Sequence, residues 1–149
     1  MKYKELQLHK VCSVTQVDKI SLLGKHILVF DSGVGGLSIL KSLCQSYLAR
    51  YTYVLDHEFF PYSDKDSSSI VNRSLRSIKR VCQNQPIDLI VVACNTAITL
   101  AISHLRAELD IPIVGVVPPI KPAASLSESG CIGVLATPVT AEGEYLQKL

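Results

Sequence analysis

The stretch LIVVACNTAIT, residues 89–99, runs from an apolar strand into a helix and carries a cysteine at the junction. The run of apolar residues predicts a strand that is covered on both faces, and helical periodicity begins only after Cys94. A thiol at that place is open to four interpretations. It can be a small core residue, a metal ligand, a nucleophile or an acid/base group.

The same order of strand, turn and helix recurs along the chain from His26. Strands are predicted at residues 26–30, 51–55, 88–93, 111–117 and 131–136. Amphipathic helices are predicted over residues 36–47, from a cap at Asp66 or Ser67 to Cys82, over residues 98–109, and from Thr137 onward. Strands that alternate with helices predict right-handed β-α-β units, so the expected fold class is α/β with a parallel sheet.

Ligands of such a sheet bind beyond the carboxyl ends of its strands. The rule selects four loops, which read DSGVGG (31–36), DHEFFPYS (56–63), CNTA (94–97) and ATPVT (136–140). The first is not a dinucleotide fingerprint, because Ser38 stands where the third glycine should be. Its backbone N–H groups suit an anion. Asp31 disfavours a phosphate there, and three roles are open to it: to bind an amino group, to hold a proton-transfer partner, or to cap the turn.

Cys94 follows its predicted strand directly, as Asp31 does. Peptide dipoles at a helix N-terminus favour a thiolate, so we expect a pKa below the ordinary ~8.5. Asn95 and Thr96 add polar groups beside it. The other four cysteines are interpreted as core or surface residues: Cys12, Cys44, Cys82 and Cys131. Five scattered cysteines without a C-x-x-C pair favour neither disulfides nor a zinc site, and no metal site is predicted.

Properties of the whole chain exclude some classes of function. No apolar run approaches the ~20 residues of a membrane span, and the N-terminus lacks the apolar core of a secretion signal. The sequence therefore predicts a cytoplasmic protein with no membrane partner. Residues 1–26 hold five lysines against Glu5 and Asp18. Such spacing is typical of a solvated extension, so a nucleic-acid partner is not favoured.

Five segments in this order and spacing resemble the glutamate racemases of the aspartate/glutamate racemase superfamily. The segments are FDSGVGGLSIL (30–40), FPYS (60–63), VVACNTA (91–97), IPIVGVVPP (111–119) and IGVLATPVT (132–140). The resemblance implies interconversion of L- and D-glutamate without a cofactor, supplying D-glutamate for peptidoglycan. In that family, two cysteines on opposite faces of the substrate remove and return its α-proton.

The resemblance also implies roles for individual residues. Cys94 would be one of the two proton-transfer cysteines, and Asp31 would act beside it in catalysis. The residues implied to bind glutamate are Asp31, Ser32, Tyr62, Ser63, Asn95, Thr96, Thr137 and Thr140. Ser63 departs from the glycine more usual after that tyrosine, which affects the backbone contact expected there.

The family's second cysteine stands in a Gly-Cys-Thr-His segment that these 149 residues do not contain. We therefore expect a truncated racemase, with residues 1–25 as an N-terminal extension, 26–118 as the first α/β lobe and 119–149 as the beginning of a second lobe. Its racemase activity would be impaired or absent. Two alternatives are open: a catalyst that exchanges the α-proton of one enantiomer, and a non-catalytic binding module. A homo-oligomer is compatible with each.

Overall fold

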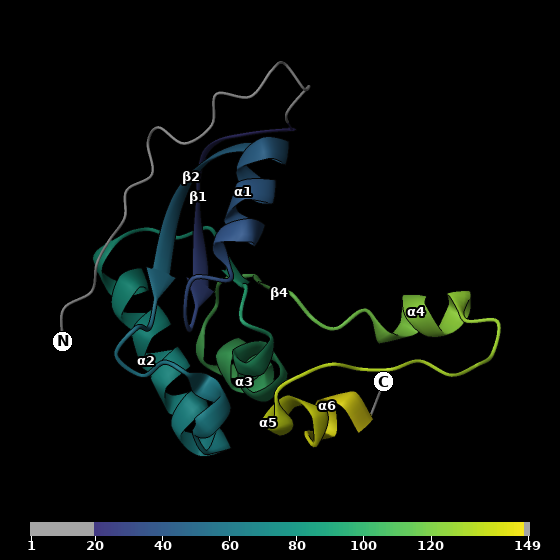
Figure 1. Cartoon of the computed structure of the whole chain (residues 1–149). Coiled ribbons are helices and arrows are strands. Elements are labelled where there is room, and N and C mark those ends of the chain that lie inside the picture. The colour runs from purple at the N-terminus through teal and green to yellow at the C-terminus, as the bar shows by residue number, and fades with distance from the viewer. Residues whose placement is uncertain (1–19, 148–149) are drawn as a thin grey trace.

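The computed structural model describes residues 20–147 and contains one parallel sheet of four strands in the order β2-β1-β3-β4. The predicted parallel α/β fold is thus confirmed (Figure 1). The strands are β1 (Ile20–Asp31), β2 (Tyr47–Leu55), β3 (Leu89–Val92) and β4 (Ile113–Gly115). The helices are α1 (Leu37–Ser46), the 3-10 turn η1 (Tyr62–Asp64), α2 (Ser67–Asn84), α3 (Asn95–Glu108), α4 (Ile120–Leu126), α5 (Pro138–Ala141) and α6 (Glu144–Gln147).

The two central strands are buried on both faces, as their apolar runs predicted. Along β1, Leu28 and Phe30 point into a core shared with α2 and α3, whereas Ile27 and Val29 point into a second core under α1. β3 alternates in the same way between its two faces. Period-two alternation with apolar residues on both sides is what a sheet between two helical layers requires.

The strands before and after α1 both begin earlier than predicted. β1 begins at Ile20, earlier than the predicted residue 26, and its pairing with β2 is irregular between Ser21 and His26. β2 begins at Tyr47, because the chain passes from α1 into the strand without a loop. The Tyr51 hydroxyl donates to the carbonyls of Leu43 and Tyr47 and stabilises this junction. The rest of the predicted extension, residues 1–19 with Cys12, lies outside the described residues.

The two helices predicted after residue 66 and over residues 98–109 are confirmed as α2 and α3, and α3 begins three residues earlier than predicted, at Asn95. The Asp66 carboxylate accepts a hydrogen bond from the Ser69 backbone N–H at 2.8 Å and so caps α2. On α3, Ile98, Ala101 and Leu105 are fully buried. These two helices pack on each other over one face of the sheet (Figure 1).

The predicted fifth strand is wrong. Residues 131–136 form no strand, and Leu135 is fully exposed. After β4 the chain leaves the sheet, forms α4 away from it and runs back to α5 beside α3 (Figure 1). A strand needs a neighbour to complete its hydrogen bonds, and within the described residues none lies beside this segment. The helix predicted from Thr137 is two short helices, α5 and α6.

No helix between residues 20 and 147 combines the length and the apolarity needed to cross a lipid bilayer.

Candidate functional site

Three predicted site loops start at the same edge of the sheet, because the parallel strands end there. The ladder of backbone hydrogen bonds continues one step past the strand ends. Asp56 N–H donates to the Asp31 carbonyl at 3.1 Å, and Ala93 N–H donates to the Phe30 carbonyl at 2.8 Å. These bonds fix where each loop leaves the sheet.

Cys94 lies at the N-cap of α3, where its sulfur accepts a hydrogen bond from the Ala97 backbone N–H at 3.4 Å. The Ser32 hydroxyl is 3.3 Å from the same sulfur. The structure therefore joins the loops after β1 and β3 through this pair of side chains. Cys94 is only 7% exposed.

The expectation of a lowered pKa for Cys94 is wrong. Burial raises the pKa of the thiol, and the negative charge of Asp31 raises it further. The hydrogen bonds from Ser32 and from the Ala97 N–H lower it, but burial is the largest effect. The helix N-terminus thus acts in the expected direction and is outweighed.

Asp31 holds the turn that follows β1. Its carboxylate accepts hydrogen bonds from the backbone N–H groups of Ser32 at 2.8 Å and Gly36 at 2.7 Å, and from the Tyr53 hydroxyl at 3.3 Å. A side chain at Gly36 would come within 3.0 Å of Asp31, Ala93 and Tyr53. Of the three roles left open by the sequence, these contacts correspond to the cap. Its carboxylate also lies near enough to Cys94 to act on the thiol's pKa.

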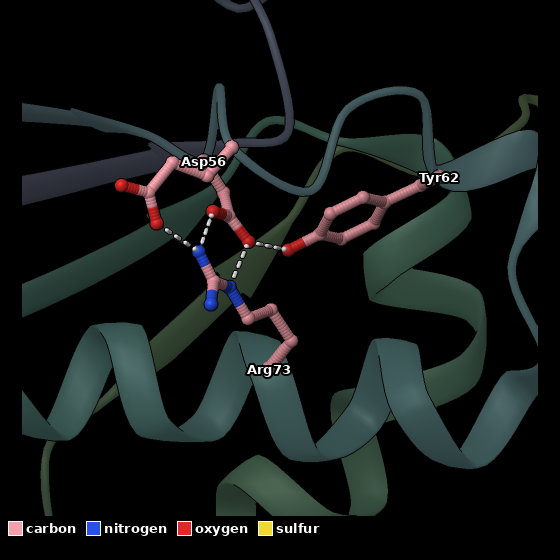
Figure 2. A network of polar contacts seen from close by, with 4 residues as sticks. Asp56, Tyr62 and Arg73 are labelled. Carbon is pink, nitrogen blue, oxygen red and sulfur yellow. Dashed lines mark hydrogen bonds and ion pairs between the residues drawn. The ribbon is translucent and has the colours of Figure 1, made fainter. Parts of the chain in front are cut away.

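The loop after β2 carries Tyr62, whose side chain is buried. The Tyr62 hydroxyl donates to the Asp56 carboxylate at 3.0 Å, and its ring belongs to the same buried cluster as Cys94 (Figure 2). Burial is the main cause that raises the pKa of Tyr62. Ser63 is partly exposed, and its hydroxyl donates to the Asp64 carboxylate at 2.8 Å.

Buried Asp56 and partly buried Arg73 form an ion pair that the sequence analysis missed (Figure 2). A signal for Asp56 was present, since it follows a strand as Asp31 does. Arg73 had no such signal, because its partner depends on how α2 packs.

The threonines at the start of α3 and α5 meet. Thr96 Oγ1 lies 3.2 Å from Thr137 Oγ1, and the Thr137 hydroxyl donates to Thr140 Oγ1 at 2.9 Å. Thr96 and Thr140 are buried, whereas Asn95 is exposed. The structure therefore brings Thr137 and Thr140 to the first turn of the helix that Cys94 caps.

This arrangement suits proton transfer by a thiol. A buried Cys94 with a raised pKa is a neutral donor at rest and a strong base once deprotonated. Backbone N–H groups and hydroxyls around it can orient a polar ligand. Within residues 20–147, no three His, Cys, Asp or Glu side chains come together as a metal site would need.

Comparisons with known proteins agree with the fold. Residues 32–149 match the family model for Asp/Glu/hydantoin racemase. Glutamate racemase of Aliivibrio fischeri (strain ATCC 700601 / ES114) is 49% identical over 126 residues, which cover 84% of this chain and 47% of that protein. Glutamate racemase of Histophilus somni (strain 2336) is 50% identical over 124 residues, which cover 83% of this chain and 46% of that protein.

Solved structures give the same result. Escherichia coli glutamate racemase, in complex with L-glutamate and the activator UDP-MurNAc-Ala, superposes with a TM-score of 0.72 at 43% identity, covering 83% of this chain and 47% of that one. Glutamate racemase from Aquifex pyrophilus superposes with a TM-score of 0.75 at 37% identity, covering 83% and 50%. The chain spans about half the length of the curated relatives it matches.

Proposed function

Because the chain belongs to the Asp/Glu/hydantoin racemase family, we propose that it carries the Cys94 side of a glutamate racemase site. The observation that supports this most directly is the buried contact of 3.3 Å between the Ser32 hydroxyl and the Cys94 sulfur, where the loops after β1 and β3 meet. We propose glutamate as the substrate, because the Escherichia coli relative was solved in complex with L-glutamate. The reaction is proposed to use no cofactor, to take place in the cytoplasm and to supply D-glutamate for peptidoglycan.

In the proposed reaction, the Cys94 thiolate removes the α-proton of one glutamate enantiomer. The C–H bond breaks, an S–H bond forms, and the electron pair stays on the substrate as a carbanion next to its carboxylate. A thiol on the opposite face then protonates that carbon. Because the amino acid's α-hydrogen is a very weak acid, preorganised N–H groups and hydroxyls must stabilise the developing charge.

The proposed binding residues come from the loops after β1, β2 and β3 and from the start of α5: Ser32, Tyr62, Ser63, Asn95, Thr96, Thr137 and Thr140. Asp31 is proposed to act through the turn it caps and through its charge near the thiol. The opposite thiol is expected in a Gly-Cys-Thr-His segment, and these 149 residues do not contain that segment. The chain by itself is therefore proposed to bind glutamate without racemising it.

A chimera tests the role of Cys94. Residues 20–149 would replace the matching part of the Aliivibrio fischeri glutamate racemase, whose later half supplies the remainder of the site. We expect the chimera to racemise glutamate, and Cys94→Ala to reduce kcat at least ~100-fold, as removal of a general base does. Cys82→Ala serves as the matched control, because Cys82 is a partly buried cysteine on α2 that packs against the core. Racemisation that survives Cys94→Ala would refute the proposal.

A second candidate function is exchange of the α-proton without inversion, because Cys94 is the one proton-transfer cysteine that the resemblance assigns within these 149 residues. The chain alone is incubated with each glutamate enantiomer in D2O, and the loss of the α-proton signal is followed by NMR. Faster exchange of one enantiomer by the wild-type chain than by Cys94→Ala would support this function. Equal exchange rates for the wild-type chain and Cys94→Ala would exclude it. Racemisation by the chain alone would contradict our account of the opposite thiol.

A non-catalytic binding module is the third candidate. The apolar side chains exposed after β4, including Leu126 and Leu135, favour it. A chain that stays monomeric and binds neither glutamate nor another protein would count against both this function and the first.

A further inference from the structure

The loop that follows β2, residues 57–63, packs against the turn after β1 and against the buried cluster that contains Cys94. Phe60 packs against the turn after β1, so that a side chain at Gly33 would lie 3.0 Å from the Phe60 ring. Tyr62 is 2% exposed and packs in the cluster that contains Cys94. The loop thus contacts both the turn that carries Ser32 and the surroundings of the thiol.

The Asp56–Arg73 ion pair anchors this loop to α2. Arg73 Nε donates to Asp56 Oδ2 at 2.7 Å, and Arg73 Nη2 donates to Asp56 Oδ1 at 2.6 Å (Figure 2). A two-point contact between a planar guanidinium and a carboxylate fixes their angle as well as their distance. Asp56 is 2% exposed and the Arg73 side chain 19%, so water screens the pair only in part.

The same pair holds the far end of the loop. Asp56 Oδ2 also accepts the hydrogen bond of the Tyr62 hydroxyl, which ties the beginning of the loop to its end. The Arg73 guanidinium lies 5.6 Å from the centre of the Phe59 ring, and Phe59 meets Tyr62 edge to face at 5.8 Å. Arg73 itself stands on a helix whose Ile70 and Ile78 are fully buried. The rigid helix therefore determines where the loop lies.

We infer that Asp56 and Arg73 are positioning residues, which hold the 57–63 loop against Ser32 and Cys94 and keep the proton-transfer site assembled. Both act through Tyr62 and Phe59, which they contact directly. The inference rests on the proposed function for the name of the site. The contacts that carry it do not depend on any substrate.

The test measures access to the Cys94 thiol in the intact chain without substrate. The rate of alkylation of Cys94 by iodoacetamide at fixed pH is followed by peptide mass spectrometry in the wild type, Arg73→Ala and Lys79→Ala. Lys79→Ala is the matched control. Lys79 lies on α2, as Arg73 does, and makes an exposed ion pair with Glu108 of α3. We expect Arg73→Ala to react about tenfold faster, since a loosened loop admits water and reagent. Lys79→Ala should match the wild type.

Rescue separates positioning from a general loss of structure. Guanidinium ion at millimolar concentration can occupy the space left by the Arg73 side chain and should slow alkylation of Arg73→Ala toward the wild-type rate. It should leave Lys79→Ala unchanged. If Arg73→Ala does not fold, the double variant Asp56→Asn/Arg73→Gln decides, because it leaves no unpaired buried charge. A folded variant that reacts at the wild-type rate, or an Arg73→Ala rate that guanidinium does not reduce, overturns the inference.

A final arm adds glutamate. Where glutamate protects wild-type Cys94 from alkylation, Arg73→Ala should lose the protection and regain it with guanidinium. Full protection in Arg73→Ala would overturn the positioning role. A wild type that glutamate does not protect refutes the proposed function, whereas the substrate-free rates still decide whether the ion pair holds the loop.

Discussion

At the scale of single residues, Cys94 shows how burial and hydrogen bonding oppose each other. The Ser32 hydroxyl and the Ala97 N–H stabilise a thiolate, yet burial keeps the thiol protonated at neutral pH. A substrate that brings a positive ammonium group would reverse part of this effect, because an opposite charge favours the ionised form. The resting state is therefore the acid form of the proposed proton-transfer pair.

The pH dependence of Cys94 reactivity follows from these contacts. We expect its alkylation rate to rise with a midpoint above the ordinary ~8.5 of a cysteine. Ser32→Ala should move the midpoint higher still, because the serine hydroxyl lowers the pKa of the thiol. The measurement is the alkylation rate of the Cys94 peptide from pH 6 to pH 11. A midpoint that falls on removal of the hydroxyl would show that Ser32 does not stabilise the thiolate.

Gly36 is required for the close approach of the turn to the sheet. A Cβ there would lie 2.9 Å from Ala93 Cβ and 3.0 Å from the Tyr53 hydroxyl. Its φ of −65° suits any residue, so the effect of a substitution is purely steric. We expect Gly36→Ala to lower the free energy of unfolding by about 1–3 kcal/mol, as overpacking does. Urea denaturation measures it, and Gly133→Ala, with no atom within 4 Å of its new Cβ, should change little.

At the scale of elements, the local hydrophobic pattern predicted the strands and the long helices of the core. The strands around residues 27–30 and 89–92 and the helices α2 and α3 were predictable, because burial on both faces and amphipathic stripes are present in the sequence itself. Residues 131–136 have the same apolar pattern and form no strand, because pairing depends on a neighbour far along the chain. The position of Cys94 was predictable from the strand and helix signals, whereas its pKa required burial that no local pattern reports.

The long helix α2 begins on a side-chain cap whose removal can be tested. The Asp66 carboxylate accepts from the Ser69 N–H and the Ser68 hydroxyl, and these bonds lower its pKa. Asp66→Ala should lower the melting temperature at pH 7, whereas Asp66→Asn, which can still accept from the N–H, should lower it less.

The acid dependence of this cap has a definite sign. A folded-state pKa below the unfolded ~3.9 contributes stability above that pH, and the contribution is lost as pH falls through the lowered value. Thermal unfolding should therefore show the gap between wild type and Asp66→Ala closing below pH 4. A gap that stays constant to pH 2 would mean that the charge contributes nothing.

At the scale of the whole molecule, the core and the segment after β4 differ in how far their residues are buried. All residues of the two buried clusters lie between Ile27 and Ile113. Beyond them, α4 has no buried residue, and Leu126 is 83% exposed. The chain returns to α3 at α5 and α6, where Thr137 and Thr140 meet Thr96.

Limited proteolysis should detect this division. We expect a nonspecific protease at low concentration to cut first within residues 127–136, which are exposed and outside helices and strands, and to leave the sheet intact. Mass spectrometry of the early fragments identifies the sites. First cuts within residues 57–63 would instead mean that the loop held by Asp56 and Arg73 opens more readily than the segment after α4.

The backbone bonds at the strand ends have a consequence for the thermodynamics of ligand binding. Because Asp56 and Ala93 are already hydrogen-bonded to the neighbouring strand, the starts of both loops are ordered before any small molecule arrives. Association then requires little loss of configurational entropy from the protein at these points. Affinity at this edge should be governed by the freedom that the ligand itself gives up and by the water that it displaces.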